Sequence, residues 1–320
     1  MSAIIKQLNK LASSYNIELT ETTYPSKFKE LIQKTSAINK AVVLIDEYDK
    51  PIIDYIDEIP KAEENRKVLK NFYSIIKEQD AHIRFFFVTG VSKFSRVSIF
   101  SDLNNLEDIT IDKRFGELTG ISQAELESCF DKHIEALEKE VGEYYPDIIK
   151  EIKQEYYGYS WDGRTRVYNP FTLLNLFAKL EFGDYWYQSG TPTFLMKLVK
   201  EGNYTTFDLE NKKMFISTFD KYEITDISLI SLLFQTGYLT ISEMNIRDRT
   251  IKLDYPNREV ERAFTIHLLA TMNGGKTTKT NSTLVEMMDA VRANNIDAFM
   301  KLFKILVKGI SYTIADNTKR

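Results

Sequence analysis

The chain has 320 residues, of which 43% are hydrophobic and 28% charged, an ordinary globular composition that predicts two or three domains. Its 42 Lys and Arg against 46 Asp and Glu give a formal charge of −4, which excludes a global basic field for nucleic acid. A single cysteine, Cys129, excludes an intramolecular disulfide and a cysteine-based zinc site. No apolar run reaches the roughly 20 residues of a membrane span and no signal peptide follows Met1, so we expect a cytoplasmic protein without a membrane partner.

The first part of the chain alternates predicted helices with buried strands. Helical spacing of apolar residues predicts a helix at about 61–79, after two shorter helices near the N-terminus. Unbroken apolar runs predict strands at 41–45 and 83–88, and such runs are typical of a parallel sheet that is covered on both faces. Helix, strand, helix and strand in this order indicate a βαβ unit, and therefore a partial α/β domain at 1–118.

The remainder predicts mostly helices. Ser122 and Glu125 form a capping box in front of a helix that runs to about residue 140. Beyond residue 206 a helix, a two-stranded hairpin and another helix follow one another, an order that resembles a winged-helix module. Further helices are expected at roughly 146–157, 170–180, 191–202, 283–293 and 296–308. The resulting parts are a helical domain at 119–205, a winged-helix-like module at 206–275 and C-terminal helices at 276–320.

The clearest chemical signal is the strand at 41–45, which runs directly into Asp46 and Glu47. A buried apolar strand that ends in two acidic residues is the Walker B arrangement of nucleotide hydrolases. In that arrangement Asp46 holds the water shell of Mg²⁺ and Glu47 polarises the attacking water. The alternative is a strand that ends in a solvated acidic turn, which is common.

The second strand ends in Thr89, followed by Ser92, Lys93 and Arg96. In ATPases of this kind a polar residue at the end of the neighbouring strand senses the γ-phosphate, and Thr89 is the first candidate for that role, with Ser92 second. Lys93 and Arg96 are candidates for contact with phosphate. The alternative for both cations is simple solvation at the start of a surface helix.

A phosphate-binding loop is missing from the sequence. No GxxxxGK[ST] occurs, and Gly274, Gly275 and Lys276 are not preceded by a strand. Without a loop of backbone N–H groups and its lysine, the β- and γ-phosphates have no cradle. We therefore expect the 320-residue chain by itself to bind Mg-ATP no more tightly than about millimolar and to be inactive as an ATP hydrolase.

Several segments resemble the bacterial AAA-ATPase-like family. The resemblance covers about residues 1–270 and depends on long motifs. They are Val42–Pro51, Arg84–Ser95, Ser98–Ile109, Tyr156–Tyr159, Val167–Phe171, Tyr185–Trp186, Ser189–Pro192, Gly237–Thr240 and Tyr255–Val260.

The resemblance implies a P-loop ATPase domain of the AAA/STAND type that uses Mg-ATP. Such domains usually begin with a strand and a P-loop about a hundred residues before the Walker B strand, whereas Met1 lies only 45 residues before Asp46. The family's P-loop segment is therefore expected to lie outside this chain. Many members also carry a PD-(D/E)xK nuclease-like domain at the C-terminus, and no strand-borne D…(D/E)xK occurs here.

Two other functions stay open. The first is a non-catalytic adaptor that binds a protein partner, a second copy or DNA through its helical and winged-helix segments, with Arg258, Arg262 and Lys252 available to DNA phosphates. The second is a nuclease-type metal site formed by Asp46, Glu47 and Asp49, against which the missing lysine partner argues.

Overall fold

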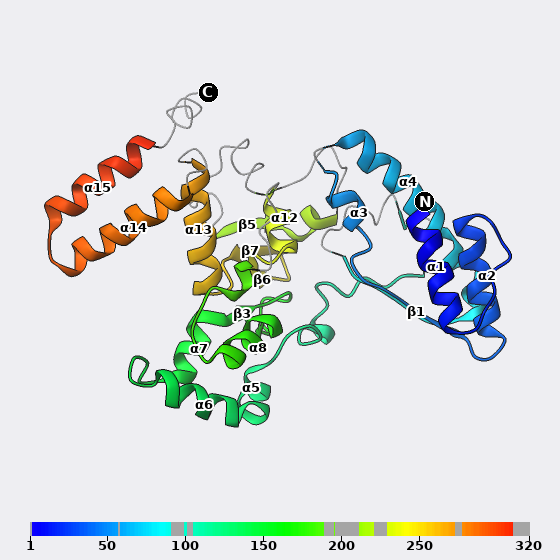
Figure 1. Cartoon of the computed structure of the whole chain (residues 1–320), viewed down its shortest axis with the longest axis horizontal. Coiled ribbons are helices and arrows are strands. Elements are labelled where there is room, and N and C mark those ends of the chain that lie inside the picture. The colour runs from blue at the N-terminus through cyan, green and yellow to red at the C-terminus, as the bar shows by residue number, and fades with distance from the viewer. Residues whose placement is uncertain are drawn as a thin grey trace. The chain divides into compact units, whose positions relative to one another are not determined.

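The computed structural model describes residues 2–56, 58–90, 99–100, 105–188, 195, 211–220, 229–272 and 277–309. The chain divides into two compact units, drawn in Figure 1. Unit 1 contains Met1–Asp108 and Ser217–Leu232, and unit 2 contains Ile109–Ile216 and Leu233–Arg320. None of the described helices combines the length and the apolar character that a membrane crossing needs.

Unit 1 contains a small parallel sheet with helices beside it. Strands β1 (Ala41–Ile45) and β2 (Ile83–Val88) pair in parallel, with Ile45 opposite Val88. Both strands, and the parallel sheet with its flanking helices, are confirmed as the sequence predicted them. The helical elements are α1 (Ser2–Ser14), α2 (Tyr24–Ser36), α3 (Lys50–Ile53), α4 (Ile59–Glu78) and the 3₁₀ turn η1 (Asp80–His82).

The helices of unit 1 bury one face of the sheet. Thr23 caps α2 by accepting a hydrogen bond from the backbone N–H of Ser26, which satisfies one of the donors that a helix start leaves open. From α2, Phe28 stacks on Phe72 of α4 with ring centroids 4.3 Å apart. The helical core packs against alternate residues of each strand, Val43 and Ile45 of β1 and Phe86 and Val88 of β2, and against Ile83 before the register shift at the start of the sheet. Alternation is expected because successive strand side chains point to opposite faces.

The opposite face of the sheet is open within the described part of the chain. Val42, Leu44 and Phe85 are 56%, 67% and 53% exposed. The prediction of a sheet covered on both faces is therefore wrong for the residues that the structure describes. An unbroken apolar run shows that both faces of a strand are apolar, but it does not show what packs on each face.

Unit 2 holds most of the helices and two further sheets. It begins with the 3₁₀ turn η2 (Lys113–Phe115). Two of the described elements cross the boundary between the units: η3 (Ile216–Asp220), of which only Ile216 belongs to unit 2, and α12 (Leu229–Gln235), which passes from unit 1 to unit 2 after Leu232. The other elements of unit 2 are α5 (Gln123–Cys129), α6 (Asp131–Val141), α7 (Ile148–Tyr156), β3 (Tyr157–Tyr159), β4 (Val167–Tyr168), α8 (Pro170–Lys179), α9 (Tyr185–Gln188), β5 (Lys212–Phe215), β6 (Thr240–Asn245), β7 (Thr250–Asp254), α13 (Arg258–Met272), α14 (Thr277–Arg292) and α15 (Ile296–Gly309).

The helix starts of unit 2 follow their capping residues. The capping box of Ser122 and Glu125 is present, and hydrogen bonds from Ser122 lower the pKa of the Glu125 carboxyl. The helix predicted to run to residue 140 is interrupted at Phe130, which separates α5 from α6. Most of the helix predicted at 191–202 lies outside the described residues.

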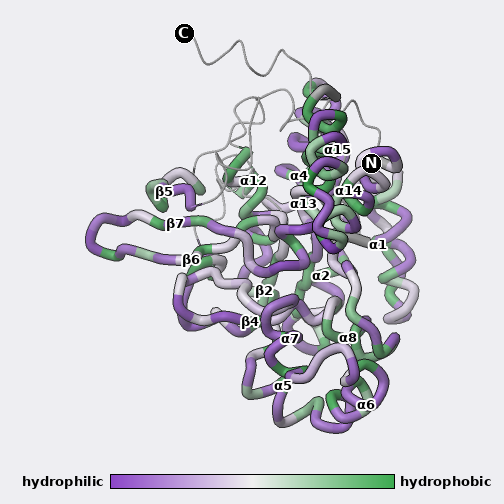
Figure 2. Tube along the Cα trace, turned by 90° about the vertical axis from the view of Figure 1, so that its left-hand side faces the viewer, coloured by the Kyte–Doolittle hydropathy of each residue, from purple (hydrophilic) through white to green (hydrophobic). Residues whose placement is uncertain are grey.

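The two small sheets of unit 2 are antiparallel. Strands β3 and β4 pair with each other, and the sequence did not predict them because three and two residues are too short for a periodicity signal. The hairpin of β6 and β7 is present as expected, and β5 adds to β7 to give the order β5-β7-β6. Figure 2 shows the outer end of this hairpin as hydrophilic. The winged-helix assignment and the four-part domain division stay predictions.

Candidate functional site

The carboxyl ends of β1 and β2 bring Asp46 and Thr89 together. The backbone pairing continues past both strands: the N–H of Thr89 donates to the carbonyl oxygen of Ile45, and the N–H of Tyr48 donates to that of Thr89, each at 2.9 Å. Residues that directly follow two neighbouring parallel strands lie at the carboxyl end of the sheet, where open α/β sheets bind ligands. The structure thus places two of the predicted site residues side by side, in unit 1.

The hydroxyl of Thr89 connects the two acidic residues. It donates a hydrogen bond to Oδ1 of Asp46 and accepts one from the backbone N–H of Glu47 at 3.3 Å. The hydroxyl therefore fixes the Asp46 carboxylate and the turn that carries Glu47. Because it is engaged in this way, Thr89 orients Asp46 in this structure, a contact that the γ-phosphate-sensor prediction did not include.

Glu47 has an unusual backbone conformation. Its φ is +50°, in the left-handed region that non-glycine residues occupy infrequently. Such a conformation costs of order 1–3 kcal/mol and persists only where the surroundings enforce it. Here the hydrogen bonds of Glu47 and Tyr48 to Thr89 hold the turn, and the side chains of Asp46 and Glu47 are exposed to solvent.

Beneath the exposed pair, the next two residues are buried. Tyr48 packs against Tyr73 and Phe100, with centroid distances of 6.4 and 5.0 Å, and Asp49 is fully buried. A Cβ at Gly90 would overlap the ring of the buried Tyr48 and lie 2.8 Å from Oδ1 of Asp49, so the close approach of the two segments favours glycine there. Sequence reasoning did not identify Tyr48 or Gly90 as parts of the site.

Burial also affects the phenol beside Asp49. Desolvation, together with the nearby carboxylate of Asp49, raises the pKa of Tyr73 well above its ordinary value. Asp49 thus lies inside the protein while Asp46 and Glu47 face solvent. This separation argues against one metal site shared by all three carboxylates, and the described residues contain no cluster of three or more His, Cys, Asp or Glu that could hold a metal.

The exposed acidic pair fits magnesium bound mainly through water. Mg²⁺ usually keeps several waters and takes one or two protein carboxylates together with substrate phosphates. Asp46 supplies such a carboxylate at the strand end, and Glu47 lies one residue further on. The remaining predicted site residues, Ser92, Lys93 and Arg96, lie outside the described residues.

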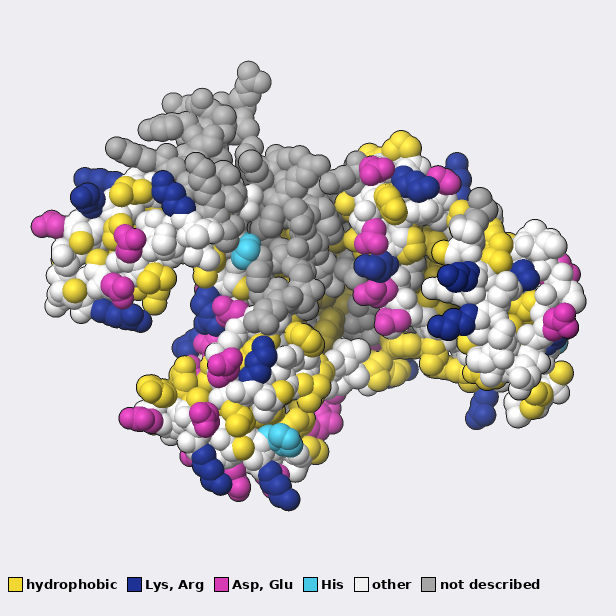
Figure 3. All heavy atoms as spheres, viewed as in Figure 1, with side chains coloured by type: hydrophobic (Ala, Val, Ile, Leu, Met, Phe, Trp, Pro, Cys, Tyr) yellow, Lys and Arg dark blue, Asp and Glu magenta, His cyan; other side chains and the backbone are white. Residues whose placement is uncertain are grey.

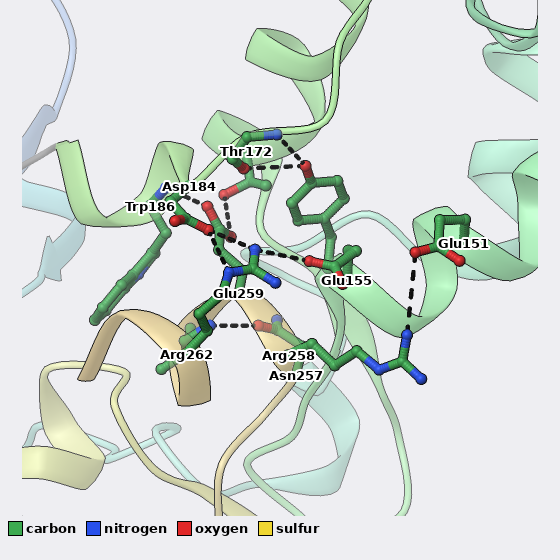
Figure 4. A network of polar contacts seen from close by, with 12 residues as sticks. Glu151, Glu155, Thr172, Asp184, Trp186, Asn257, Arg258, Glu259 and Arg262 are labelled. Carbon is green, nitrogen blue, oxygen red and sulfur yellow. Dashed lines mark hydrogen bonds and ion pairs between the residues drawn. The ribbon is translucent and has the colours of Figure 1, made fainter. Parts of the chain in front are cut away.

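Unit 2 contains a separate buried polar network, shown in Figure 4. Glu259 of α13 is 1% exposed and accepts hydrogen bonds from the backbone N–H of Trp186 at 2.7 Å and from the hydroxyl of Thr172 at 3.4 Å. Burial is the main cause that raises the pKa of Glu259 to about 7, and the nearby charge of Asp184 adds to it. The network joins α8, α9 and α13 and explains why residues of separate sequence motifs lie together.

The three basic residues that the adaptor hypothesis assigns to contact with DNA phosphates each lie next to a carboxylate in the structure. Arg262 contacts Asp184 at 2.5 Å and Glu155 at 2.9 Å, and Figure 4 shows both contacts. Arg258 lies 4.0 Å from Glu151, and Lys252 lies 3.2 Å from Glu243. These pairs leave little uncompensated positive charge for phosphates at these positions.

Comparison with known proteins finds a family match within unit 1. Residues 1–100 match the model of the AAA-ATPase-like family, described as a predicted AAA-ATPase. The chain is also 41% identical, over 257 residues, to an Azotobacter chroococcum mcd 1 protein described as "Uncharacterized protein in vnfD 5'region". That alignment covers 79% of this chain and 48% of the relative, so the chain spans about half the length of the curated relative it matches. No solved structure matches the chain.

Proposed function

We propose that unit 1 is the acidic half of an ATPase-type Mg-nucleotide site. The observation that carries the proposal is the convergence of Asp46, Glu47 and Thr89 at the carboxyl ends of two adjacent parallel strands. The match of residues 1–100 to the AAA-ATPase-like family supports it. The acidic pair is the part of such a site that holds the cation and polarises water.

Each residue has a role that its position supports. The Asp46 carboxylate, fixed by the Thr89 hydroxyl, would hold the water shell of Mg²⁺. Glu47 is exposed and lies in a turn that its backbone hydrogen bond to Thr89 holds in place. Its carboxylate can therefore accept a proton from a water molecule at the carboxyl end of the sheet. When bound, Mg²⁺ would neutralise phosphate charge. Ser92, Lys93 and Arg96 remain candidates for phosphate contact.

Affinity is expected to be weak in the 320-residue chain. Its sequence contains no GxxxxGK[ST], so the charge-assisted hydrogen bonds of a phosphate loop, worth roughly 1.5–3 kcal/mol each, are not supplied by these residues. The adaptor alternative stays a prediction, and the pairing of Arg258, Arg262 and Lys252 argues against its DNA-binding form.

Paramagnetic broadening detects such weak binding. We expect substoichiometric Mn²⁺ with excess ATP to broaden the NMR amide signals of residues 45–49 and 88–90 selectively. Asp46→Asn keeps the side-chain size and an oxygen for Thr89 but removes the charge, and it should reduce the broadening at least about tenfold, the loss expected for about 1.4 kcal/mol. Glu78→Gln, an exposed carboxylate at the end of α4, is the matched control and should leave the broadening unchanged.

The proposal has a clear contradictory outcome. Broadening that is centred on other residues, or that survives Asp46→Asn undiminished, would remove the acidic pair from the nucleotide site. A micromolar Mg-ATP dissociation constant by calorimetry would contradict the expected weak affinity but not the location of the site.

A further inference from the structure

The hairpin of β6 and β7 gathers the arginines of unit 2 that have no acidic partner. Within the described part of unit 2, half of the arginines form ion pairs with carboxylates, namely Arg114, Arg258, Arg262 and Arg292. The other half form no ion pair with a described carboxylate, and they all lie in the hairpin or in the β3–β4 loop that packs against it. These are Arg164, Arg166, Arg247 and Arg249.

The four arginines reach the hairpin from two segments of the chain. Arg247 and Arg249 are exposed in the turn between β6 and β7, and Figure 2 shows this turn, purple for hydrophilic, at the outer end of the hairpin. Arg166 donates a hydrogen bond at 3.3 Å to a backbone carbonyl of β6, that of Ser242. Arg164 is exposed and directly follows a glycine that packs closely against β6.

The acidic residues nearby leave the hairpin positively charged. Residues 160–166, 212–216 and 240–254 contain seven Lys and Arg but four Asp and Glu, although the whole chain carries a formal charge of −4. In the turn, the carboxylate of Asp248 accepts a hydrogen bond from the side-chain amide of Asn245 at 2.8 Å. By contrast, the view of unit 2 in Figure 3 mixes basic and acidic side chains over α5, α6, α14 and α15.

The turn holds its basic and apolar side chains in exposed positions. Arg249 has a φ of +53°, in the left-handed region that glycine and asparagine adopt with less strain than arginine. Its carbonyl oxygen accepts a hydrogen bond from the N–H of Ile216 at 2.9 Å, which fixes the turn to the end of β5. Close to this bond, Phe215 is 63% exposed, and Ile246 of the turn is 69% exposed. The end of the hairpin therefore presents arginines together with apolar side chains.

We propose that the end of the β6–β7 hairpin binds double-stranded DNA, mainly through the phosphate backbone. Arginine suits phosphate because its planar guanidinium stays charged and donates two parallel hydrogen bonds. The major groove of B-DNA admits a two-stranded β-ribbon, whereas the major groove of A-form RNA is too deep and narrow for side chains to read. DNA is therefore the duplex that a hairpin of this kind fits.

The arginines and the apolar side chains have separate roles in this contact. Arg164, Arg247 and Arg249 supply a sequence-independent attraction to phosphates. Phe215 and Ile246 can contact thymine methyl groups in the groove. The surface does not include the ion-paired arginines of α13. All its residues belong to unit 2, so the inference is independent of the Mg-nucleotide site proposed for unit 1.

Fluorescence anisotropy with a labelled duplex of mixed sequence, about 20 base pairs long, tests the proposal. At about 50 mM salt we expect a micromolar dissociation constant that rises steeply with added salt. Arg247→Gln combined with Arg249→Asn should raise this constant about tenfold or more. The same variant should reduce the slope of log K against log salt by about 2, since each phosphate contact contributes about 0.9.

The variants are chosen so that unfolding cannot imitate a loss of binding. Asparagine tolerates the left-handed conformation at position 249, so Arg249→Asn alone should unfold in urea at no lower concentration than the wild type. Arg164→Gln lies outside the turn and should raise the dissociation constant severalfold without disturbing the hairpin. It keeps the test decisive if the double variant of the turn does not fold.

The matched control removes the same charge elsewhere in unit 2. Arg258→Gln combined with Arg292→Gln replaces two exposed, ion-paired arginines, and it should leave the dissociation constant within about twofold and the salt slope unchanged. The proposal is overturned if the duplex does not bind at about 50 mM salt, or if the control loses as much affinity as the hairpin variant. Binding to phosphatidylglycerol vesicles without binding to DNA would also overturn it.

Discussion

Replacing Gly158 with alanine is expected to lower the free energy of unfolding of unit 2 by about 4 kcal/mol. Gly158 lies in β3 with a φ of +137°, a conformation that L residues adopt only with strain of about 1–3 kcal/mol. A Cβ on this residue would also overlap the carbonyl oxygen of Pro256, and overpacking of this kind adds roughly 1–3 kcal/mol. Because the overlapping oxygen belongs to the backbone of Pro256, no side-chain rotation can relieve the overlap.

Urea unfolding followed by tryptophan fluorescence measures this effect, because both tryptophans, Trp161 and Trp186, belong to unit 2. Gly183→Ala is the matched control in the same unit. Gly183 has no positive φ, and the nearest atoms to its added Cβ belong to the ring of Tyr185 at 3.1 Å, so a loss below about 1 kcal/mol is expected. Equal effects of the two substitutions would contradict the packing described for Gly158.

Unit 2 is expected to lose stability as the pH rises from 5 to 8, because of Glu259. The folded-state pKa of this carboxyl is about 7, above the ordinary 4.5, so its stabilising contribution is full below pH 4.5 and is lost as the pH passes through 7. A shift from 4.5 to about 7 corresponds to about 3 kcal/mol. The Glu259→Gln variant cannot ionise, and we expect it to exceed the wild type by about 2–3 kcal/mol at pH 8 and to differ little at pH 5.

The difference between variant and wild type at each pH is the quantity to measure. His267 of the same helix has a pKa that burial lowers, so its stabilising effect increases over part of this pH range and opposes that of Glu259. Its contribution cancels when Glu259→Gln is compared with the wild type. Glu261→Gln replaces an exposed carboxylate of the same helix and is the control; it should not reproduce the gain in stability at pH 8. The prediction is contradicted if Glu259→Gln is less stable than the wild type at pH 8, since the fold would then stabilise the charged carboxylate.

The framework of unit 1 is predictable from sequence because its signals are local. Unbroken apolar runs define β1 and β2, and the parallel pairing then places Asp46 next to Thr89, as expected. The direction of the Thr89 hydroxyl was not predictable, since it depends on a backbone turn at Glu47 that no residue pattern signals. The sequence also does not show that Asp49 is buried while Asp46 and Glu47 are exposed, because all three residues are acidic and lie within four positions.

The features that sequence reasoning missed come from contacts between distant segments. Gly158 must be glycine because of Pro256, which lies far along the chain, and no local rule marks that approach. Glu259 has a raised pKa because Trp186 and Thr172 enclose it from two other elements. The open face of the sheet was missed because Val42 and Leu44 have the residue types of a covered strand.

The central claim, that Asp46 and Thr89 mark a Mg-nucleotide site, is tested most directly by locating the metal. Crystals of the chain soaked in Mn²⁺ and ATP at tens of millimolar should show an anomalous manganese peak about 4 Å from the Asp46 carboxylate, the separation expected when one water bridges metal and carboxylate. Phosphate density should lie on the far side of the metal from β1. A manganese peak elsewhere on the protein, with none near Asp46, would contradict the account.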